Sequence, residues 1–227
     1  MRKLFLFVFS HRVLALLRWD VHFLRIRLTN FALRKGQALR RFAAGRSSPV
    51  YLNLGSGPRG LGDSHWVNVD GFADRNVHFL IDFNRPLPFE DQSLDGAFCE
   101  HVLEHFTQDD GLRIMQEVRR CLKPGGVFRI VVPNGEWVMR TYFENPDFLV
   151  QHRLKGEGQA MEAVNSYFRQ RYEHQFLYDW PTMEATLRKA GFSTVTKTDF
   201  NKSVLCPDIC LDDEKYAPES LYVEAAK

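Results

Sequence analysis

VYLNLGSGPRG, residues 50–60, joins an apolar run to a glycine-rich turn, and the rest of the chain can be read outward from this junction. Residues 50–54 are apolar and β-branched in the way that is typical of a parallel strand buried on both faces. Gly55-Ser56-Gly57 follows directly, and glycine lets the backbone approach a ligand where a Cβ atom would clash. The stretch therefore predicts a cofactor-binding turn at the carboxyl end of a first strand.

Gly55, Gly57 and Gly60 also have the spacing of the dinucleotide-binding fingerprint. In that fold a full crossover helix follows the glycines, and the ribose-binding acid comes about 20 residues later. Here only a short connection, residues 61–65, precedes the next strand-like run, which ends at Asp70. The missing helix argues against a dinucleotide-dependent oxidoreductase, which stays open as an alternative.

A strand with a glycine turn, a short connection and a second strand that ends in an acid resemble the class I S-adenosylmethionine-dependent methyltransferases. The resemblance implies S-adenosyl-L-methionine as the cofactor, with its methionine end on the glycine turn. The cofactor contacts that it implies are the turn residues Asn53, Gly55, Ser56 and Gly57, the ribose partner Asp70, and the adenine partners Asp82 and Phe83. The sequence departs from the family where Asn53 replaces a common acid and where Arg59 replaces a third glycine.

Residues 85–106, RPLPFEDQSLDGAFCEHVLEHF, carry a second set of motifs. Pro86 and Pro88 exclude a helix, and residues 94–99 predict a buried strand. The string resembles the PLPF and HVLEH motifs of a type 11-like branch of these methyltransferases, in which a strand of this kind leads into the active site.

Within that branch, the resemblance implies that Glu100 and His101 line the mouth of the cofactor and substrate site and that a helix starts at Val102. At helical spacing, His101, Glu104 and His105 would share one face. Related ubiquinone-pathway methyltransferases carry a Glu-x-x-Glu-His motif here that has been linked to metal. Because His101 replaces the first glutamate of that motif, we expect no metal ion.

Residues 107–126 predict a helix with Thr107 as its N-cap and Lys123-Pro124-Gly125-Gly126 as its stop, and a strand follows. Alternating strands and helices indicate an α/β, Rossmann-like fold whose mostly parallel sheet has helices on both faces. Residues 192–200 and 220–227 predict two more strands. The resemblance implies seven strands, of which the last is antiparallel and inserted between the fifth and the sixth.

Residues 135–178 interrupt this alternation with aromatic and arginine side chains, and we expect this insertion to form the acceptor pocket. His174, near its end, is a candidate general base, because a neutral imidazole can accept a proton near pH 7. His101 and His105 are the other candidates for this catalytic role. A purely structural role for His174 stays open.

Residues 1–46 differ in charge from the rest of the chain. They hold 11 Lys or Arg and one acid, Asp20, a net charge of +10, whereas the remainder holds 19 basic and 27 acidic residues, a net charge of −8. No apolar stretch approaches the roughly 18 residues of a membrane-spanning helix. We expect a basic amphipathic helical arm that binds an anionic membrane surface, with packing on the domain or on a partner as the alternative. Nucleic acid is a poor partner, because the acidic remainder would repel phosphates.

The polar break at residues 45–49 separates this arm from a methyltransferase domain of residues 47–227. Four cysteines without a paired framework, and the lack of a signal-peptide pattern, favour a cytoplasmic location with contact at the inner face of the membrane.

The expected activity is methyl transfer from S-adenosylmethionine to an oxygen of a sugar, a glycan or another small-molecule acceptor. A nicotinamide-dependent oxidoreductase and a non-catalytic, membrane-associated scaffold with the same fold are the alternatives.

Overall fold

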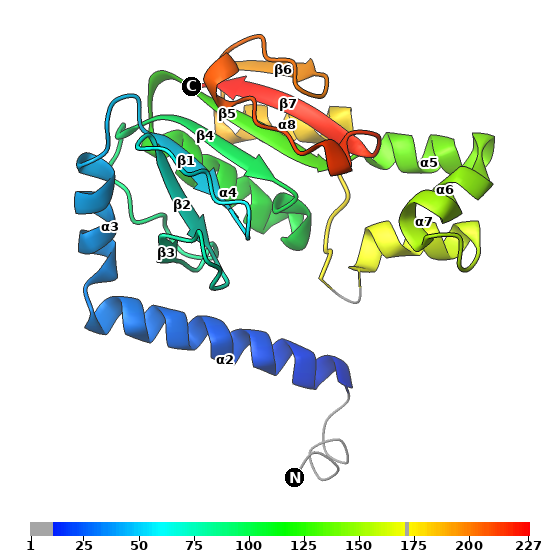
Figure 1. Ribbon diagram of the computed structural model, residues 1–227, viewed down its shortest axis with the longest axis horizontal. Helices are drawn as coiled ribbons and strands as arrows, with labels where there is room; N and C mark the ends of the chain where they lie inside the picture. Colours follow the sequence, from blue (N-terminus) through cyan, green and yellow to red (C-terminus); the bar gives the residue numbers. More distant parts are fainter. Residues whose placement is uncertain (1–10, 171–172) are drawn as a thin grey trace.

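All seven strands pair into one sheet in the computed structural model, which describes residues 11–170 and 173–227 (Figure 1). The first ten residues of the arm, and Arg171 and Tyr172 of the insertion, lie outside the described residues. The strands are β1 (Tyr51–Leu54), β2 (Trp66–Asp70), β3 (Phe79–Leu80), β4 (Leu94–Glu100), β5 (Leu122–Pro133), β6 (Thr194–Thr198) and β7 (Ser220–Ala226). The helices are α2 (His11–Ala32), α3 (Lys35–Ala44), α4 (Gln108–Cys121), α5 (Gly135–Glu144), α6 (Pro146–Leu154), α7 (Ala160–Arg169) and α8 (Trp180–Ala190). Three short 3-10 helices are η1 (Leu103–His105), η3 (Pro207–Ile209) and η4 (Glu214–Tyr216).

The order of the strands is β3-β2-β1-β4-β5-β7-β6. The pairs from β3 to β5 are parallel, and β7 is antiparallel to both β5 and β6. This arrangement confirms the predicted seven-stranded fold with its last strand inserted between the fifth and the sixth. The connection between β1 and β2, residues 55–65, contains no helix, as the sequence indicated.

Alternating side chains of the strands enter two separate apolar clusters. Leu52 and Leu54 of β1 belong to the main core, which α3, α4 and α8 cover. Tyr51 belongs to the opposite face, where Ile209 of η3 packs. This second face is covered by the connection from β6 to β7, residues 199–219, with only the short helices η3 and η4, rather than by the expected α-helices. The physical reason is that a parallel crossover needs about a dozen residues or more to hold a helix, and the β1–β2 connection is shorter.

The helix expected after β4 does not form as one continuous segment. His101 has a left-handed φ of 53°, and η1 ends at His105, before Phe106, whose φ of −112° and ψ of 155° are extended. The α-helix starts only after Thr107, whose Oγ1 accepts the amide of Asp110 at 3.2 Å, so this predicted N-cap is confirmed. The predicted stop at residues 123–126 is wrong, because α4 ends at Cys121 and those residues already belong to β5.

From residue 11 onward the arm consists of the helices α2 and α3, and α3 is part of the core. Leu39 and Ala43 of α3 are buried beside Val50 and Leu52, with only 1% of Leu39 exposed. Phe42 packs against Phe79 with ring centroids 5.4 Å apart. The proposed boundary after residue 46 therefore cuts through a packed unit, and α2 is the projecting part of the arm.

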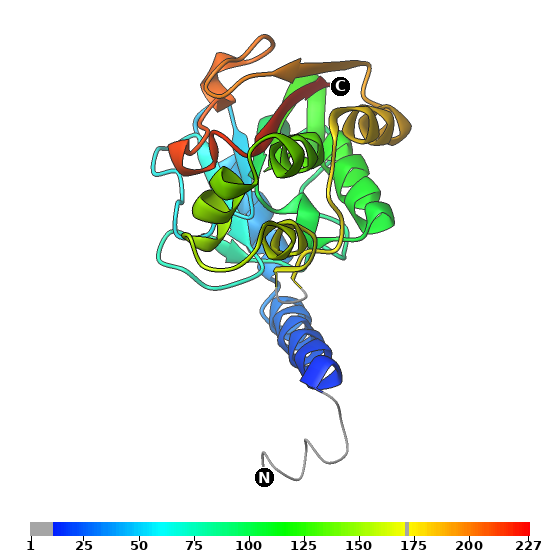
Figure 2. The same cartoon turned by 90° about the vertical axis from the view of Figure 1, so that its right-hand side faces the viewer.

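Helix α2 contacts the rest of the chain along a narrow stripe and projects from it (Figure 2). His22 Nε2 donates to the carbonyl of Gly71 at 2.8 Å, and Asn30 Nδ2 donates to that of Leu80 at 2.9 Å. On its other side, Leu24, Leu28 and Phe31 are exposed, Phe31 to 85%. No helix among the described residues has the length and hydropathy of a membrane span.

A buried charge cluster fastens the 199–219 connection to the second face of the sheet. Arg129 of β5 is fully buried, and its guanidinium pairs with Asp212 and, at 3.1 Å, with Oε1 of Glu224. Glu224 Oε2 also accepts the backbone amides of Val204 and Leu205 at 2.9 and 2.8 Å. Because each buried charge has an opposite charge and further hydrogen bonds, the desolvation cost is offset, and the connection is held in one place.

We predict that Asp212→Asn lowers the free energy of unfolding by about 3–5 kcal/mol, because it leaves the buried guanidinium of Arg129 short of a counter-charge. Urea unfolding followed by circular dichroism measures this loss. The matched control is Asp199→Asn in the same connection, whose carboxylate forms an exposed pair with Lys202 and should change stability by less than about 1 kcal/mol. Equal unfolding midpoints for the two variants would contradict the role of the cluster.

Candidate active site

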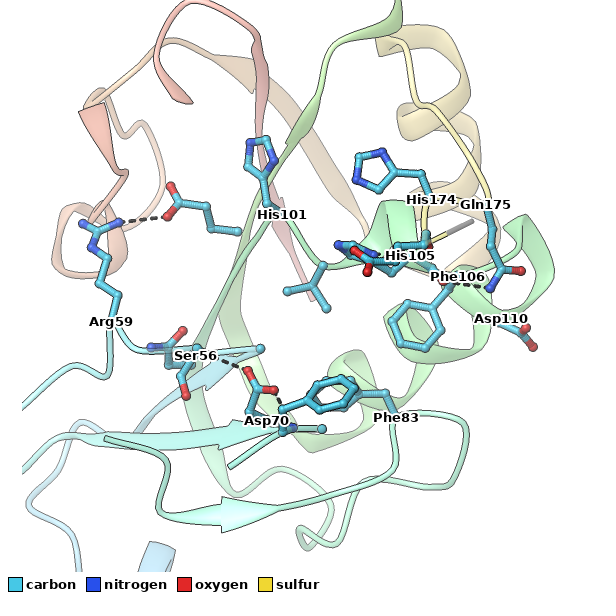
Figure 3. Close-up of a pocket in the computed structure, with 18 of the residues that line it drawn as sticks. Ser56, Arg59, Asp70, Phe83, His101, His105, Phe106, Asp110, His174 and Gln175 are labelled. Atoms are coloured by element: carbon cyan, nitrogen blue, oxygen red, sulfur yellow. Dashed lines mark hydrogen bonds and ion pairs between the residues drawn. The ribbon is translucent and has the colours of Figure 1, made fainter. Parts of the chain in front are cut away.

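A cavity of about 1430 Å³ opens at the carboxyl ends of β1, β2 and β4 (Figure 3). This is the edge at which ligands bind in sheets of this kind. Helix α2, the glycine turn, the segment after β4, the end of α7 and η4 all contribute to its lining. Every predicted site residue except Asp82 lies on its wall.

The glycine turn forms one end of the cavity with backbone angles that favour glycine. Gly55 and Gly57 have φ values of 74° and 48°. A Cβ atom on Gly55 would lie 2.2 Å from Cγ2 of Val102, whereas one on Gly57 would meet no atom within 4 Å. Ser56 Oγ is buried without a hydrogen-bond partner among the described residues. The turn therefore offers a polar cradle with one unused hydroxyl.

Asp70, the last residue of β2, holds the glycine turn in place. Its Oδ2 accepts the amide of Gly57 and its Oδ1 accepts the amide of Phe72, both at 2.8 Å. Each carboxylate oxygen has a second lone pair, so Asp70 can still accept a hydrogen bond from a hydroxyl group in the cavity.

Asn53 occupies the position where the family commonly has an acid, and the structure gives it a partner. Its Nδ2 donates to Oδ1 of Asn68 on the neighbouring strand at 3.1 Å. Asn68 in turn bonds both the amide and the carbonyl of Leu61. Asn53 thus helps to fix the β1–β2 connection at the wall of the cavity.

The two residues expected at the adenine lie in different places. Phe83 lines the cavity, with its ring edge-on to Phe106 at 6.2 Å between centroids. The carboxylate of Asp82 instead faces α2, where Oδ2 lies 3.4 Å from the guanidinium of Arg27. Asp82 is not among the residues that line the cavity, so the adenine contact predicted for it has no support in the structure. The sequence could not show this, because the partner comes from the arm.

Glu100 lies at the mouth of the cavity, where Arg59 binds it. Its Oε2 accepts from Arg59 at 2.8 Å, and its Oε1 accepts the amide of Asp213 at 2.8 Å. Burial raises the pKa of Glu100, against the lowering effect of these two partners. Arg59, which replaces a family glycine, also donates to the carbonyl of Leu211, so it ties the glycine turn to the 199–219 connection. Its departure from the family pattern was the one sequence signal of this role.

His101 lies between three partners on the cavity wall. Its Nε2 is 2.9 Å from Oγ of Ser220, and its Nδ1 is 3.3 Å from Oε1 of Glu104. The ring stacks on Tyr216 of η4 with centroids 3.7 Å apart. Because both nitrogens face neighbouring groups, His101 is better placed to hold other side chains than to accept a proton itself.

His105 and His174 meet on the side of the cavity away from the glycine turn. Their rings are nearly perpendicular, with centroids 4.9 Å apart, and Glu104 lies beside them. Nδ1 of His174 donates to the carbonyl of Tyr167 at 2.6 Å, and burial lowers the pKa of His174, which favours the neutral ring. Burial alone would raise the pKa of Glu104, but the adjacent imidazoles of His101 and His105 lower it below its ordinary value.

The insertion contributes to the cavity through its last part only. Asn165, Phe168 and Arg169 at the end of α7, with Glu173 to Gln175 after it, line the wall. Helices α5 and α6 pack with α7 around a separate apolar cluster that includes Val138 and Leu149. Sequence reasoning missed Trp19, Phe23 and Tyr216, which also line the cavity from distant parts of the chain.

Comparison with known proteins finds methyltransferases among the proteins that this chain is similar to. A model of a methyltransferase domain matches residues 70–130. Over 104 residues, the chain is 29% identical to a sterol 24-C-methyltransferase of Gibberella zeae. The alignment covers 46% of this chain and 25% of that protein. Over 105 residues, the chain is 32% identical to a probable tRNA methyltransferase 9B of Bos taurus, and the alignment covers 44% of this chain and 22% of that protein. A solved structure of phosphoethanolamine N-methyltransferase 2 of Haemonchus contortus, in complex with S-adenosyl-L-methionine, aligns with a TM-score of 0.49 at 16% identity, covering 85% of this chain and 51% of that one.

The strand order and the matched domain agree with the resemblance to the class I S-adenosylmethionine-dependent methyltransferases, a class whose cofactor is S-adenosyl-L-methionine. The chain spans about a quarter of the length of the curated relatives that it matches. The domain match, together with the absence of a helix from residues 55–65, removes the support for a dinucleotide-dependent oxidoreductase.

We predict that Asp70→Ala weakens binding of S-adenosylhomocysteine about 10- to 100-fold, because hydrogen bonds to a charged group are worth about 1.5–3 kcal/mol and every 1.4 kcal/mol is tenfold. Isothermal titration calorimetry measures the affinity. Asp74→Ala is the matched control, since Asp74 lies in the same loop and its carboxylate bonds only to the neighbouring amide of Arg75 outside the cavity. Unchanged affinity of a folded Asp70→Ala protein would contradict the assignment.

Proposed function

We propose that this protein transfers a methyl group from S-adenosylmethionine to a hydroxyl oxygen of a sugar, a glycan or a similar small molecule. The observation that carries the proposal is a single cavity with the glycine turn and Asp70 at one end and a histidine and carboxylate cluster at the other. Its volume of about 1430 Å³ exceeds the roughly 300–1,000 Å³ of a pocket for one small ligand, so it has room for a cofactor and an acceptor.

The cofactor end fits a charged amino acid joined to a nucleoside. The free Oγ of Ser56 and the exposed turn backbone at Gly57 suit the amino-acid part, Asp70 suits the ribose hydroxyls, and Phe83 gives an apolar surface for the base. When bound, S-adenosylmethionine supplies a methyl group that its sulfonium centre already activates. The task left to the protein is to orient the acceptor. Such orientation lowers the activation free energy by up to about 7–11 kcal/mol.

The acceptor end mixes aromatic rings with neutral polar groups. Phe106 and Phe168 offer flat apolar surfaces, and Asn165 and Gln175 offer amide donors and acceptors. Such a lining suits a sugar, which has apolar ring faces and many hydroxyl groups. This supports a hydroxylated acceptor and gives no support to a purely apolar one.

Removal of the acceptor proton is assigned to His105 or His174. The Nδ1 atoms of both rings face backbone carbonyls, of Glu173 and Tyr167, so each neutral ring keeps the lone pair of its Nε2. General base catalysis of this kind raises the reaction rate by about 10²- to 10⁴-fold. His101 acts as a positioning residue, because it contacts Glu104 and supports η1.

To test the function, the purified protein is incubated with methyl-labelled S-adenosylmethionine and fractions of a membrane and glycan extract. We expect label in a carbohydrate-containing fraction that resists mild base, as a methyl ether does, and loss of most of that label with Asp70→Ala. Label in protein or RNA instead would contradict the acceptor class. Tight cofactor binding without transfer to any fraction would favour the non-catalytic scaffold.

We further propose that α2 brings this cavity to an anionic membrane surface at the inner face of the cell membrane. Exposed Leu24, Leu28 and Phe31 lie on a helix that also carries Arg18 and Arg25, a combination that suits acidic lipid headgroups. Trp19 and Phe23 of the same helix line the cavity. A membrane contact through α2 would therefore place the mouth of the cavity beside the headgroups, where a lipid-linked acceptor is available.

For this arm we predict that Leu28→Glu combined with Phe31→Glu moves the protein from the pellet to the supernatant when it is centrifuged with vesicles that contain anionic lipid. Affinity for S-adenosylhomocysteine should not change. Phe143→Glu on α5 is the matched control, because Phe143 is also 79% exposed and lies outside the arm. Equal pelleting of the double variant and the control would remove the membrane proposal.

A further inference from the structure

Three metal-ligating side chains converge at the acceptor end of the cavity. Glu104 and His105 come from η1, and His174 comes from the segment after α7. One ring nitrogen of each histidine and one carboxylate oxygen of Glu104 lie within 4.8 Å of one another. Figure 3 shows His105 and His174 on the same side of the cavity, with Phe106 next to them.

Backbone hydrogen bonds fix the tautomer of both histidines. Nδ1 of His174 lies 2.6 Å from the carbonyl of Tyr167, and Nδ1 of His105 lies 3.2 Å from that of Glu173. A carbonyl only accepts, so each Nδ1 carries the hydrogen and each Nε2 carries the free lone pair. A histidine that ligates a metal through one nitrogen and donates the other N–H to a carbonyl has this arrangement.

Glu104 is a buried acid whose side chain is not satisfied by the protein. Only 1% of the residue is exposed, and neither carboxylate oxygen accepts a hydrogen bond from the part of the chain that the structure describes. His101 Nδ1, 3.3 Å from Oε1, is the one close polar contact that the described residues give this carboxylate besides the two imidazoles. A buried carboxylate with only this one long contact is costly, and a cation beside it would offset that cost.

We propose that Glu104, His105 and His174 bind one divalent transition-metal ion of the zinc type. Two imidazoles and one carboxylate are the three protein ligands of many open zinc sites, and imidazole ligands favour zinc and similar transition metals over magnesium. The cavity, which His105 and His174 line, leaves further coordination positions open to a ligand. The sequence had led us to expect no metal, because His101 replaces the first glutamate of the related motif and His174 is distant in the chain from that motif.

The surrounding residues complete the site. Ligand atoms around a tetrahedral ion with bonds of about 2.0–2.1 Å are about 3.3 Å apart. Because the three side chains already place theirs within 4.8 Å of one another, small side-chain rotations would bring them to this spacing. His101, held by Ser220 and Tyr216, would orient the carboxylate of Glu104 as an outer partner. If an ion binds the Nε2 atoms of both His105 and His174, neither histidine can act as the general base. The ion would then act as a Lewis acid on the acceptor hydroxyl, and this role rests on the proposed function.

The test is direct measurement of bound metal on the full chain without a polyhistidine tag. After removal of metal with a chelator, one equivalent of Zn²⁺ or Co²⁺ is added, excess is removed, and metal is counted by mass spectrometry and by the visible spectrum of bound Co²⁺. We expect about one ion per chain. Glu104→Gln and His174→Ala should each weaken binding more than 100-fold, and His101→Gln should weaken it about 10- to 100-fold, the range for outer partners.

His65→Gln is the matched control, because His65 bonds backbone carbonyls near Pro49, away from this cluster, and should keep the ion. Circular dichroism shows whether each variant is folded. No stoichiometric ion on the wild type, or equal loss in the control and the cluster variants, overturns the site. Binding of S-adenosylhomocysteine is measured on the same samples: if it persists without metal binding, only the metal site fails, and if it is absent while metal binds, only the proposed function fails.

Discussion

The hydrogen bond from the amide of Gly57 to the carboxylate of Asp70 sets the geometry of the cavity. It joins the ends of β1 and β2 and keeps the turn in backbone angles that only glycine adopts without strain. Gly55 adds a second constraint, because Val102 from the segment after β4 packs where a Cβ atom would lie. Three neighbouring strands thus end at one polar edge, and the backbone there stays accessible to a ligand.

The opposite face of the sheet supports the same edge from behind. The buried Arg129, Asp212 and Glu224 cluster fixes the 199–219 connection where a crossover helix would otherwise lie. From this anchored connection, the amide of Asp213 reaches Glu100 and the ring of Tyr216 reaches His101. A charge cluster with no contact to the cavity therefore positions two residues on its wall, so stability and site geometry are coupled.

The acceptor end is assembled differently from the cofactor end. Its walls come from α2, from η1 and from the end of α7, which are far apart in the sequence. The aromatic and amide groups, the two histidines of the histidine and carboxylate cluster and the α2 residues Trp19 and Phe23 all line this one cavity. The proposed membrane contact of α2, the proposed hydroxylated acceptor and the proposed metal site are consistent with one another.

Much of the fold and of the cofactor end could be predicted, because the signals are local. The glycine turn, the acid at the end of β2, the N-cap Thr107 and the inserted last strand follow from short patterns or from a family resemblance carried by them. An error occurred in the helix expected to start at Val102, which is only the short η1 because Phe106 after it is extended.

The chain's own sequence determined the strands, the glycine turn and the charge of the arm, since each depends on residues within a few positions of one another. Only the tertiary structure decided that α3 completes the core, that Asp82 faces Arg27, and that His174 reaches Glu104 and His105. The physical reason is that these contacts join segments separated by long connections. Side-chain direction there is set by packing between elements, which leaves no periodic trace in the sequence.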